Sequence, residues 1–433
     1  MSADDRTAFV SPPRSRSPPG AAIVSTAAPG ETGRRWEHAE FAALFFLQAG
    51  AIGMWQVCFG SVLKAHGLER FIPYAYACTA LSAFVSPMFV GALADQRIAP
   101  TRLLRWLSGS GAAFLALAFV AIDRGWGAWW MLAFVQLHAL CATPTFSLLT
   151  SIVFARLREP SREFGPLRAW ATFGWIAAGW TVSWILKADA TTGSGYAAAA
   201  TFAGVSLFSF FIPVVLPTEL KLARSWRDLF GLEALELLRD RDHRVVFLTA
   251  ALYNAPLAAF YPYAPIHLRA VGVEHATAVM TLGQVTEILA MFWLANLLAR
   301  VRLKWLFLIG IGCGVLRYAL FALNTRTWLF VGITLHGFAF ALYFITAQLY
   351  VEHRVEARLR TRAQALLALM SGGFGNLFGA LGAGWWRLSC AAAGETNWPL
   401  YWLGLSGTTA LVFLYFAVNY KGSYRFVARP KLD

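Results

Sequence analysis

Long apolar stretches recur along this chain and are separated by short polar segments. Each stretch reaches the length of about 18 residues or more that a helix needs to cross a bilayer. The pattern therefore predicts an all-α membrane protein with twelve transmembrane helices. The predicted spans are residues 40–62, 71–94, 103–122, 127–155, 169–187, 196–217, 245–268, 277–299, 305–324, 327–350, 363–386 and 399–419.

One long polar segment, residues 218–244, divides the spans into six and six. We expect an N-terminal bundle over residues 37–217 and a C-terminal bundle over residues 245–419. Two six-helix bundles around a cavity at the bilayer midplane are typical of the major facilitator fold. Within the segment, leucines suggest a short amphipathic helix on the membrane surface, with a plain linker helix as the alternative. These leucines are Leu229, Leu232, Leu235 and Leu238.

Charge fixes the expected orientation of the spans. The 433 residues are 58% hydrophobic and 14% charged, with a net charge of +14. If the N-terminus lies inside, 29 of the 37 Lys and Arg residues fall in cytoplasmic tails and loops and 7 in outer loops. This bias predicts a bacterial inner-membrane protein with both termini in the cytoplasm. Because the basic residues are scattered over short loops, we do not expect nucleic acid as a partner.

The two ends and the cysteines carry no recognisable site. Residues 1–36 are rich in Pro, Ser, Gly and Ala and predict a disordered cytoplasmic tail, with the first span as an uncleaved signal. Residues 420–433 form a second cytoplasmic tail. The five cysteines show no metal-ligand spacing, and four of them lie in predicted spans, which argues against a disulfide framework.

Motifs of soluble catalysis and of ATP-driven pumping are missing from the sequence. There is no phosphate-binding G-x-x-x-x-G-K-[ST] loop, no H-E-x-x-H and no G-x-S-x-G. We therefore expect no enzyme and no cofactor, and a proton gradient as the driving force. A single chain of six plus six helices also disfavours a channel.

Away from the span ends, the ionisable side chains that qualify as candidates are Glu287, Arg317 and His336, with His138. Such groups cost about 3 kcal/mol each at the bilayer centre, so they mark functional positions. At about 1.5 Å per residue, the first three lie roughly 13–18 Å from a membrane surface, near one level. We hypothesise a proton-coupling site in which Glu287 binds the proton, Arg317 promotes its release and His336 relays it or binds substrate. The alternative is a structural Glu287–Arg317 pair, with His336 bonded to a backbone carbonyl.

Polar and aromatic residues on neighbouring helices are candidates for binding substrate. Gln284 lies one turn before Glu287 and shares its face. Arg168, Thr172 and Trp175 follow one another at helical spacing, and Trp175 could stack on a flat ring. For Arg168 the alternative is an anchor at the inner membrane surface, and for any single aromatic residue the alternative is packing. The predicted seventh helix offers a further wall. Its candidates are Tyr253, Asn254, Tyr261 and Tyr263.

The loop after the second span reads Gly91-Ala-Leu-Ala-Asp95-Gln-Arg97. It resembles the G-x-x-x-D-R-x-x-R loop of the major facilitator superfamily, with Gln96 in place of an arginine. A glycine allows close helix approach, and a carboxylate can pair with basic groups or a helix N-terminus. The resemblance implies a cytoplasmic gate at Gly91, Asp95 and Arg97. The glycines of the eleventh span, by contrast, indicate close packing or a hinge.

Several motifs together resemble the nucleoside:proton symporters of the major facilitator superfamily. The similarity implies that Gln48, Arg168, Thr172, Trp175, Gln284 and Glu287 line a nucleoside cavity. The motifs are Phe46-Leu47-Gln48, Pro144-Thr145, Arg168-Ala-Trp170-Ala-Thr172-Phe-Gly174-Trp175, Ser225-Trp226, Gln284-Val-Thr-Glu287 and Leu316-Arg317.

The chain departs from that family at two places. Ala341 occupies the position of an acidic residue in the tenth helix, and Ala258 and Tyr261 occupy positions of a glutamine and an asparagine in the seventh. Glu287, Arg317 and His336 also resemble the proton-coupling residues of oligosaccharide:proton symporters, with Ala339 replacing a second glutamate there.

These observations lead to one main hypothesis and two alternatives. The main one is a monomeric secondary transporter that takes up nucleosides with protons by alternating access. A proton symporter of sugars or aromatic acids is the first alternative. A sensor or interaction protein that keeps the fold without transport is the second, and the missing acid at Ala341 is its best support.

Overall fold

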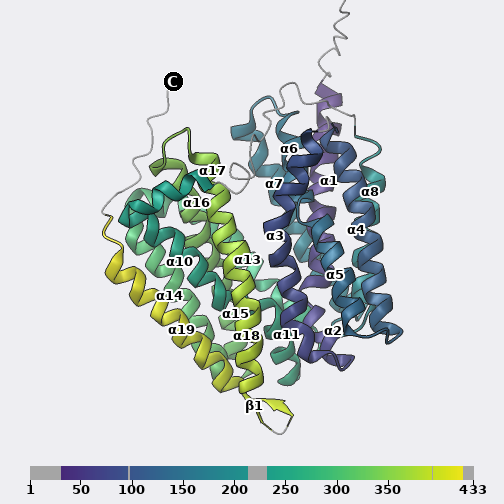
Figure 1. The fold of residues 1–433 in the computed structure, drawn as a ribbon, viewed down its shortest axis with the longest axis vertical. Helices are drawn as coiled ribbons and strands as arrows, with labels where there is room; N and C mark the ends of the chain where they lie inside the picture. The colour runs from purple at the N-terminus through teal and green to yellow at the C-terminus, as the bar shows by residue number, and fades with distance from the viewer. Residues whose placement is uncertain (1–30, 96–97, 213–231, 393, 423–433) are drawn as a thin grey trace, which may run out of the picture.

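The computed structural model describes residues 31–95, 98–212, 232–392 and 394–422. Within these ranges the regular structure is helical, apart from a short antiparallel hairpin of β1 (Ala391–Ala392) and β2 (Glu395–Thr396). The long helices run side by side in two groups, coloured purple to blue and teal to yellow in Figure 1.

The first group corresponds to the first six predicted spans. The span predicted at 127–155 consists of two helices that meet at Thr143-Pro144, because proline lacks an N–H and disfavours a helical residue before it. The helices are α1 (Glu31–Gln56), α2 (Phe59–Ala65), α3 (Ile72–Asp95), α4 (Pro100–Asp123), α5 (Ala128–Ala142), α6 (Thr145–Phe154), α7 (Pro160–Trp180) and α8 (Gly193–Phe208), with the short 3-10 helix η1 (Glu69–Phe71).

The second group corresponds to the last six predicted spans, several of which again consist of consecutive helical pieces. The helices are α10 (Arg241–Leu257), α11 (Phe260–Ala270), α12 (Ala276–Met280), α13 (Leu282–Arg300), α14 (Leu303–Ala322), α15 (Arg326–Phe340), α16 (Thr346–Arg354), α17 (Arg360–Ala368), α18 (Asn376–Ser389) and α19 (Trp398–Asn419).

Three of the spans contain a π-helical turn, in which each N–H bonds to the carbonyl five residues earlier. These are η2 (Thr181–Ile185) after α7, η4 (Ala341–Ile345) after α15, and η5 (Leu369–Gly375) between α17 and α18. Such turns are rare and occur mostly as single insertions, frequently at functional sites. Here they end α7 and α15 and precede α18.

The predicted boundaries differ from the observed ones at two points. The described part of helix α1 starts at Glu31, so residues 31–36 of the tail predicted as disordered are helical. In the segment between the two bundles, a 3-10 helix η3 (Leu232–Arg239) takes the place of the expected amphipathic α-helix. Its Glu236 pairs with Arg358 at 3.1 Å, which holds η3 against the C-terminal bundle. Leu229 lies outside the described residues.

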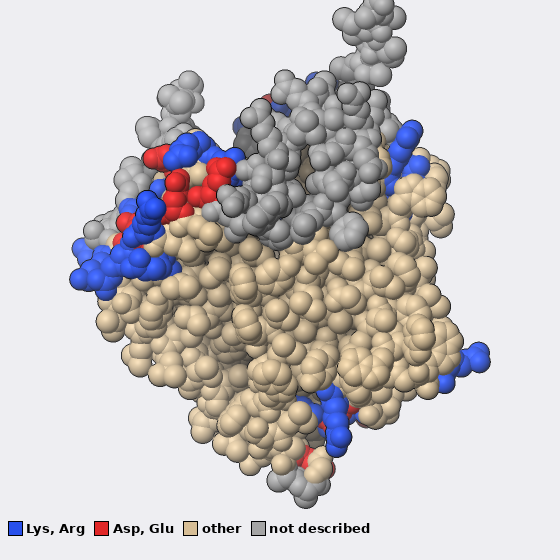
Figure 2. All heavy atoms as spheres, viewed as in Figure 1, with Lys and Arg blue, Asp and Glu red and all other residues tan. Residues whose placement is uncertain are grey.

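On the face shown in Figure 2, an apolar belt lies between two charged ends. Figure 2 shows Lys, Arg, Asp and Glu gathered at the top and bottom, with other residues between them. Among the described residues, nine helical stretches are long and apolar enough to cross a membrane by length and composition. Together with α3, α7 and α8, which run alongside them, these stretches form the two six-helix bundles of a multi-pass membrane protein.

Glycines allow the closest helix contacts within each bundle. A β-carbon at Gly174 of α7 would overlap the carbonyl of Phe46 in α1. In the same way, a β-carbon at Gly337 of α15 would overlap the backbone nitrogen of Glu287 in α13. The absence of a side chain at Gly337 thus lets α13 and α15 touch at the level of Glu287.

We call the end where α1 begins and α19 ends the termini face, and the end with the hairpin the opposite face (Figure 1). At the opposite face an ion pair joins the two bundles. Arg387 of α18 is 4% exposed, and its Nη1 donates to Glu69 Oε1 at 2.7 Å and to Thr396 Oγ1 at 2.9 Å.

A second set of contacts at the opposite face joins the end of α7–η2 to the start of α12. The carboxylate of Asp189 accepts the backbone N–H of Thr277 at 2.7 Å, and Ser183 Oγ accepts that of Ala278 at 2.9 Å. Ser183 also donates to Asp189 at 2.9 Å. Residues of the N-terminal bundle therefore cap a helix of the C-terminal bundle.

Candidate functional site

A cavity of about 510 Å³ lies between the two bundles and is lined by residues of both. Its wall mixes apolar and aromatic side chains with a few polar groups, which is the usual make-up of a small-molecule site. Besides Asn254, the lining residues include seven that the sequence analysis singled out for a role. They are Arg168, Thr172, Trp175, Tyr261, Gln284, Glu287 and His336.

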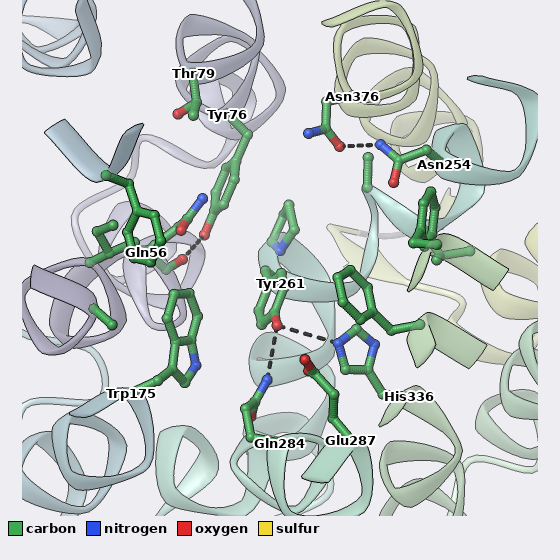
Figure 3. Close-up of a pocket in the computed structure, with 18 of the residues that line it drawn as sticks. Gln56, Tyr76, Thr79, Trp175, Asn254, Tyr261, Gln284, Glu287, His336 and Asn376 are labelled. Atoms are coloured by element: carbon green, nitrogen blue, oxygen red, sulfur yellow. Dashed lines mark hydrogen bonds between the residues drawn. The ribbon is translucent and has the colours of Figure 1, made fainter. Parts of the chain in front are cut away.

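A chain of hydrogen bonds forms the C-terminal wall of the cavity. Gln284 Nε2 donates to the Tyr261 hydroxyl at 3.1 Å, and His336 Nε2 lies 3.4 Å from the same oxygen. Figure 3 shows the Glu287 carboxylate next to this pair of contacts and directed into the cavity. The amide, the phenol, the imidazole and the carboxylate thus converge on one spot.

Arg317 lies behind this cluster and fixes the state of His336. Its side chain is fully buried, and its Nη1 lies 2.7 Å from His336 Nδ1. A guanidinium can only donate, so Nδ1 accepts and the imidazole is neutral with its proton on Nε2. His336 therefore points an N–H toward Tyr261 and the cavity. A second bond, from Arg317 Nη2 to Tyr318 at 2.8 Å, holds the guanidinium in place.

The Tyr261 hydroxyl consequently receives two donors, Gln284 Nε2 and the N–H of His336. Its own proton is then free to be donated into the cavity. Close by, Gln284 Oε1 is buried without a hydrogen-bond partner among the described residues. The cluster thus presents one O–H donor, one amide acceptor and one carboxylate to whatever enters the cavity.

The Glu287–Arg317 pair of the structural alternative is not formed in this structure. Arg317 is occupied by His336 and Tyr318, and Glu287 makes no hydrogen bond or ion pair with another described residue. Arg168 of α7, in the facing bundle, lines the same cavity as Glu287. The sequence analysis paired Glu287 with the arginine nearest to it in depth. The orientation of α14 about its own axis, however, directs Arg317 toward His336.

The N-terminal wall is formed largely by α7. Arg168 stacks over the ring of Phe146, 4.5 Å from its centroid, and Thr172 and Trp175 follow on the same face. The ring of Trp175 lies 5.9 Å from that of Tyr261, so the two bundles approach each other here through aromatic side chains. An aromatic ring at this position offers a stacking surface for a flat ligand.

Gln48 is not part of the cavity wall, although the family resemblance implied it. It is fully buried, and its Nε2 donates to Thr145 Oγ1 at 2.5 Å. The bond ties α1 to the first residue of α6, behind the wall. Tyr253 and Tyr263 are likewise buried in the packing; the hydroxyl of Tyr253, for example, donates to the Gly310 carbonyl at 2.8 Å.

His138 is a packed core histidine. Its Nδ1 lies 2.8 Å from the carbonyl of Gly111, and aromatic rings surround it. The predicted gate cannot be placed in the same way. Gly91 and Asp95 belong to the last turns of α3, where only the backbone is described, and Arg97 lies outside the described residues.

Asn254, a candidate of the sequence analysis, lines the cavity together with polar residues that the sequence analysis did not single out. Asn254 Nδ2 donates to the Ser371 carbonyl at 2.8 Å and to Asn376 Oδ1 at 2.6 Å, which orients both amides (Figure 3). Gln56, Tyr76, Thr79 and Asn376 also line the cavity. The sequence marks these residues only as polar positions inside apolar spans. Because neutral polar side chains are common in spans, their presence does not show which residues face a cavity.

The two departures from the family pattern can also be located. Ala258 lines the cavity, so the missing amide leaves space in the wall. Ala341 is fully buried and begins the π-helical turn η4. Asn254, one turn before Ala258, brings an amide to the same wall.

Comparison with known proteins agrees with this architecture. The family model described as nucleoside H⁺ symporter matches residues 38–425. The candidate nucleoside transporter YegT of Escherichia coli (strain K12) is 30% identical over 419 residues, covering 91% of this chain and 96% of YegT. The nucleoside permease NupG of the same organism is 26% identical, covering 89% of this chain and 96% of NupG.

Solved structures agree as well. The crystal structure of a mutant of the nucleoside transporter NupG superposes with a TM-score of 0.82 at 25% identity, covering 89% of this chain and 100% of that one. The POT family transporter PepTSo, at 12% identity and a TM-score of 0.68, shares the fold alone. Matched over nearly its whole length, and folded as two six-helix bundles around a shared cavity, the chain belongs to the nucleoside H⁺ symporter family of the major facilitator superfamily.

Proposed function

We propose that the protein takes up nucleosides together with protons by alternating access, and that it acts as a monomer. The observation that carries the proposal is the convergence of Glu287 with Gln284, Tyr261 and His336 on one wall of the cavity. The family membership and the names of the permeases to which the chain is similar support the substrate class.

The geometry suits a sugar carrying hydroxyls and a flat base. The hydroxyls of a ribose are both donors and acceptors, so they can receive the O–H of Tyr261 and donate to Gln284 Oε1. Trp175, across the cavity, supplies an apolar face on which a base can stack. Binding through these groups joins the two bundles through the substrate, since Trp175 and Gln284 belong to different bundles.

Glu287 is proposed as the proton site. In its protonated form the carboxyl is neutral and can be held in an apolar wall at low cost. When the cavity is hydrated, the positive charge of Arg168 on the facing wall can stabilise the carboxylate form. Because Arg168 and Glu287 lie in opposite bundles, their separation changes as the bundles move, and proton affinity changes with it.

The structure is proposed to represent the inward-facing state. The contacts Arg387–Glu69 and Asp189–Thr277 close the opposite face. The distribution of Lys and Arg supports placing the termini face in the cytoplasm. Labelling of single cysteines near Arg241 from inside, but not from outside, is the expected result, and labelling from outside contradicts the orientation.

The central test is transport by Glu287→Gln in vesicles with an imposed proton gradient. The amide mimics the protonated carboxyl permanently, so gradient-driven accumulation of labelled nucleoside should be lost. Exchange of nucleoside across the membrane should continue at least in part, because exchange needs no net release of a proton. Accumulation at the wild-type rate would show that coupling lies elsewhere, with His336 the next candidate.

A proton symporter of sugars is the second candidate function. The direct Arg317–His336 bond next to Glu287, together with the alanine at 258, favours it, since fewer amides remain in the wall to read a base. A panel of nucleosides, sugars and aromatic acids in the same vesicles separates the two. Uptake of none of them, by protein that folds and inserts normally, would favour a role without transport.

A further inference from the structure

A second cavity, of about 380 Å³, lies away from the transport site on the outer surface of the C-terminal bundle, between α14 and α19. Three basic residues and an exposed tryptophan surround its mouth, and apolar side chains form its floor. The basic residues are Arg302, Lys304 and Lys421; the others are Trp305, Leu308, Phe413 and Ala417.

The cavity lies at the membrane boundary on the termini face. Lys304 and Trp305 belong to the first turn of α14, and Lys421 follows the last residues of α19. Trp and Lys at the ends of spanning helices mark the level of the lipid headgroups. In Figure 2, basic side chains border the apolar belt at the upper left, where these helix ends lie in Figure 1.

The charges at the mouth leave a net excess of positive charge. Lys304 Nζ donates to the Ala417 carbonyl at 2.7 Å, which fixes the ammonium over the end of α19 with hydrogens to spare. The nearby carboxylate of Asp242 accepts the backbone N–H of Lys421 at 3.1 Å. The three cations thus outnumber this carboxylate, while the positive end of the α14 dipole is offset by the negative end of the α19 dipole beside it.

Below the mouth the surface continues as an apolar groove. Gly312 of α14 has no side chain to fill the space in front of Phe413 of α19. Ile309 and Leu414 are exposed along the same two helices. A hydrocarbon chain can therefore follow the groove toward the bilayer centre while its headgroup stays at the mouth.

We propose that this cavity binds an anionic phospholipid, with the phosphate between Arg302, Lys304 and Lys421 and an acyl chain along the α14–α19 groove. The three cations favour an anionic headgroup. The apolar groove favours a lipid over a free phosphate, because only a lipid has an acyl chain to fill it. Basic pockets between spanning helices bind anionic headgroups in this way. The site is separate from the transport cavity and does not depend on the transported substrate.

The test measures lipid binding to the purified, delipidated full chain by native mass spectrometry, with phosphatidylglycerol and phosphatidylcholine of identical acyl chains as probes. The variant Arg302→Gln/Lys304→Gln/Lys421→Gln removes the three cations. Each basic residue near an anionic lipid contributes about five-fold in affinity, so the triple variant should lose on the order of 100-fold for phosphatidylglycerol. Its affinity for phosphatidylcholine should stay unchanged.

A matched control removes the same charge from exposed positions at the termini face outside the cavity. The control is Arg102→Gln/Arg158→Gln/Arg239→Gln, and it should keep wild-type affinity. If both triple variants lost the same affinity for phosphatidylglycerol, the loss would come from general surface charge, and the proposed binding site would be wrong. If the first triple variant folds poorly, Arg302→Gln/Lys421→Gln keeps the Lys304–Ala417 bond and should still lose about 25-fold.

Soluble competitors separate a lipid from a free anion. Inorganic phosphate and glycerol phosphate should fail to displace phosphatidylglycerol at concentrations where the lipid is bound. Displacement by either at comparable concentration would show that the acyl chain contributes nothing, and the lipid assignment would be wrong.

Discussion

The contact between Arg387 and Glu69 should set the balance between the two states of the transporter. The two side chains belong to different bundles and meet at the opposite face, which is closed in this structure, so separating the bundles there must break the contact. Replacing Glu69 with glutamine keeps the shape but removes the charge. The buried guanidinium of Arg387 then faces a neutral amide oxygen instead of a carboxylate, beside Thr396 and the ring of Tyr263, 5.7 Å away.

The size of the effect follows from the burial of the pair. Removing one partner of a fully buried ion pair costs about 3–5 kcal/mol. The side chain of Arg387 is 5% exposed but that of Glu69 is 28% exposed, so water screens part of the interaction. We expect about 1–3 kcal/mol, which shifts the equilibrium toward the state with an open opposite face by roughly 5- to 150-fold.

The matched control is Lys64→Gln. Lys64 lies 3.8 Å from Glu69, with its side chain 45% exposed. An exposed pair of this kind contributes about 0–1 kcal/mol, so the control should leave the equilibrium nearly unchanged. Comparing Glu69→Gln with Lys64→Gln thus tests whether the burial of Arg387, and not charge alone, decides the shift of the equilibrium.

The assay is the distance between spin labels at Arg70→Cys and Ser389→Cys, which are exposed on the two bundles near the pair. A background without the native cysteines is required. Glu69→Gln should increase the population at long distance, whereas Lys64→Gln should not. A distance distribution that Glu69→Gln leaves unaltered, or that both variants change equally, would refute the reasoning.

Two further predictions concern the cavity. Trp175→Ala should weaken nucleoside binding by about 1–3 kcal/mol, the range for stacking of bases on aromatic rings, and Trp175→Phe by less; equal and negligible effects in a binding titration would assign Trp175 to packing. Gly337→Ala inserts a methyl group against the backbone of Glu287 and should lower stability by about 1–3 kcal/mol and displace α13. A thermal-unfolding midpoint and an uptake rate both equal to wild type would show that α13 and α15 are less tightly packed there.

Much of the fold could be predicted from the sequence because the bilayer simplifies the problem. Repeated apolar stretches have few structures open to them in lipid, so the positions of spans such as α14 and α19 follow from hydropathy. Depth follows from counting residues along a span. That is why Glu287 and His336 could be expected at one level, and both line the cavity.

Rotation about the helix axis could not be predicted in the same way. Gln48 and Arg317 are at suitable depths, but the first faces Thr145 behind the wall and the second faces the far side of His336. Which side of a span faces the cavity depends on how twelve helices pack, and local sequence carries little information on it when nearly every side is apolar. Asn376 was missed for this reason, since it follows the π-helical turn η5 and a run of glycines that indicated only packing.

The cap on α12 makes the opening of the opposite face a matter of hydration as well as of rigid-body movement. The N–H groups of Thr277 and Ala278 have no acceptor within their own helix and use Asp189 and Ser183 of the other bundle. When the bundles separate there, two amides lose their acceptors together, and the Asp189 carboxylate keeps only the hydroxyl of Ser183 among these partners. Water must enter to solvate all three, so the energetic barrier to opening includes the wetting of a junction that is dry when closed. The rate at which the transporter resets can thus depend on how readily water reaches Asp189.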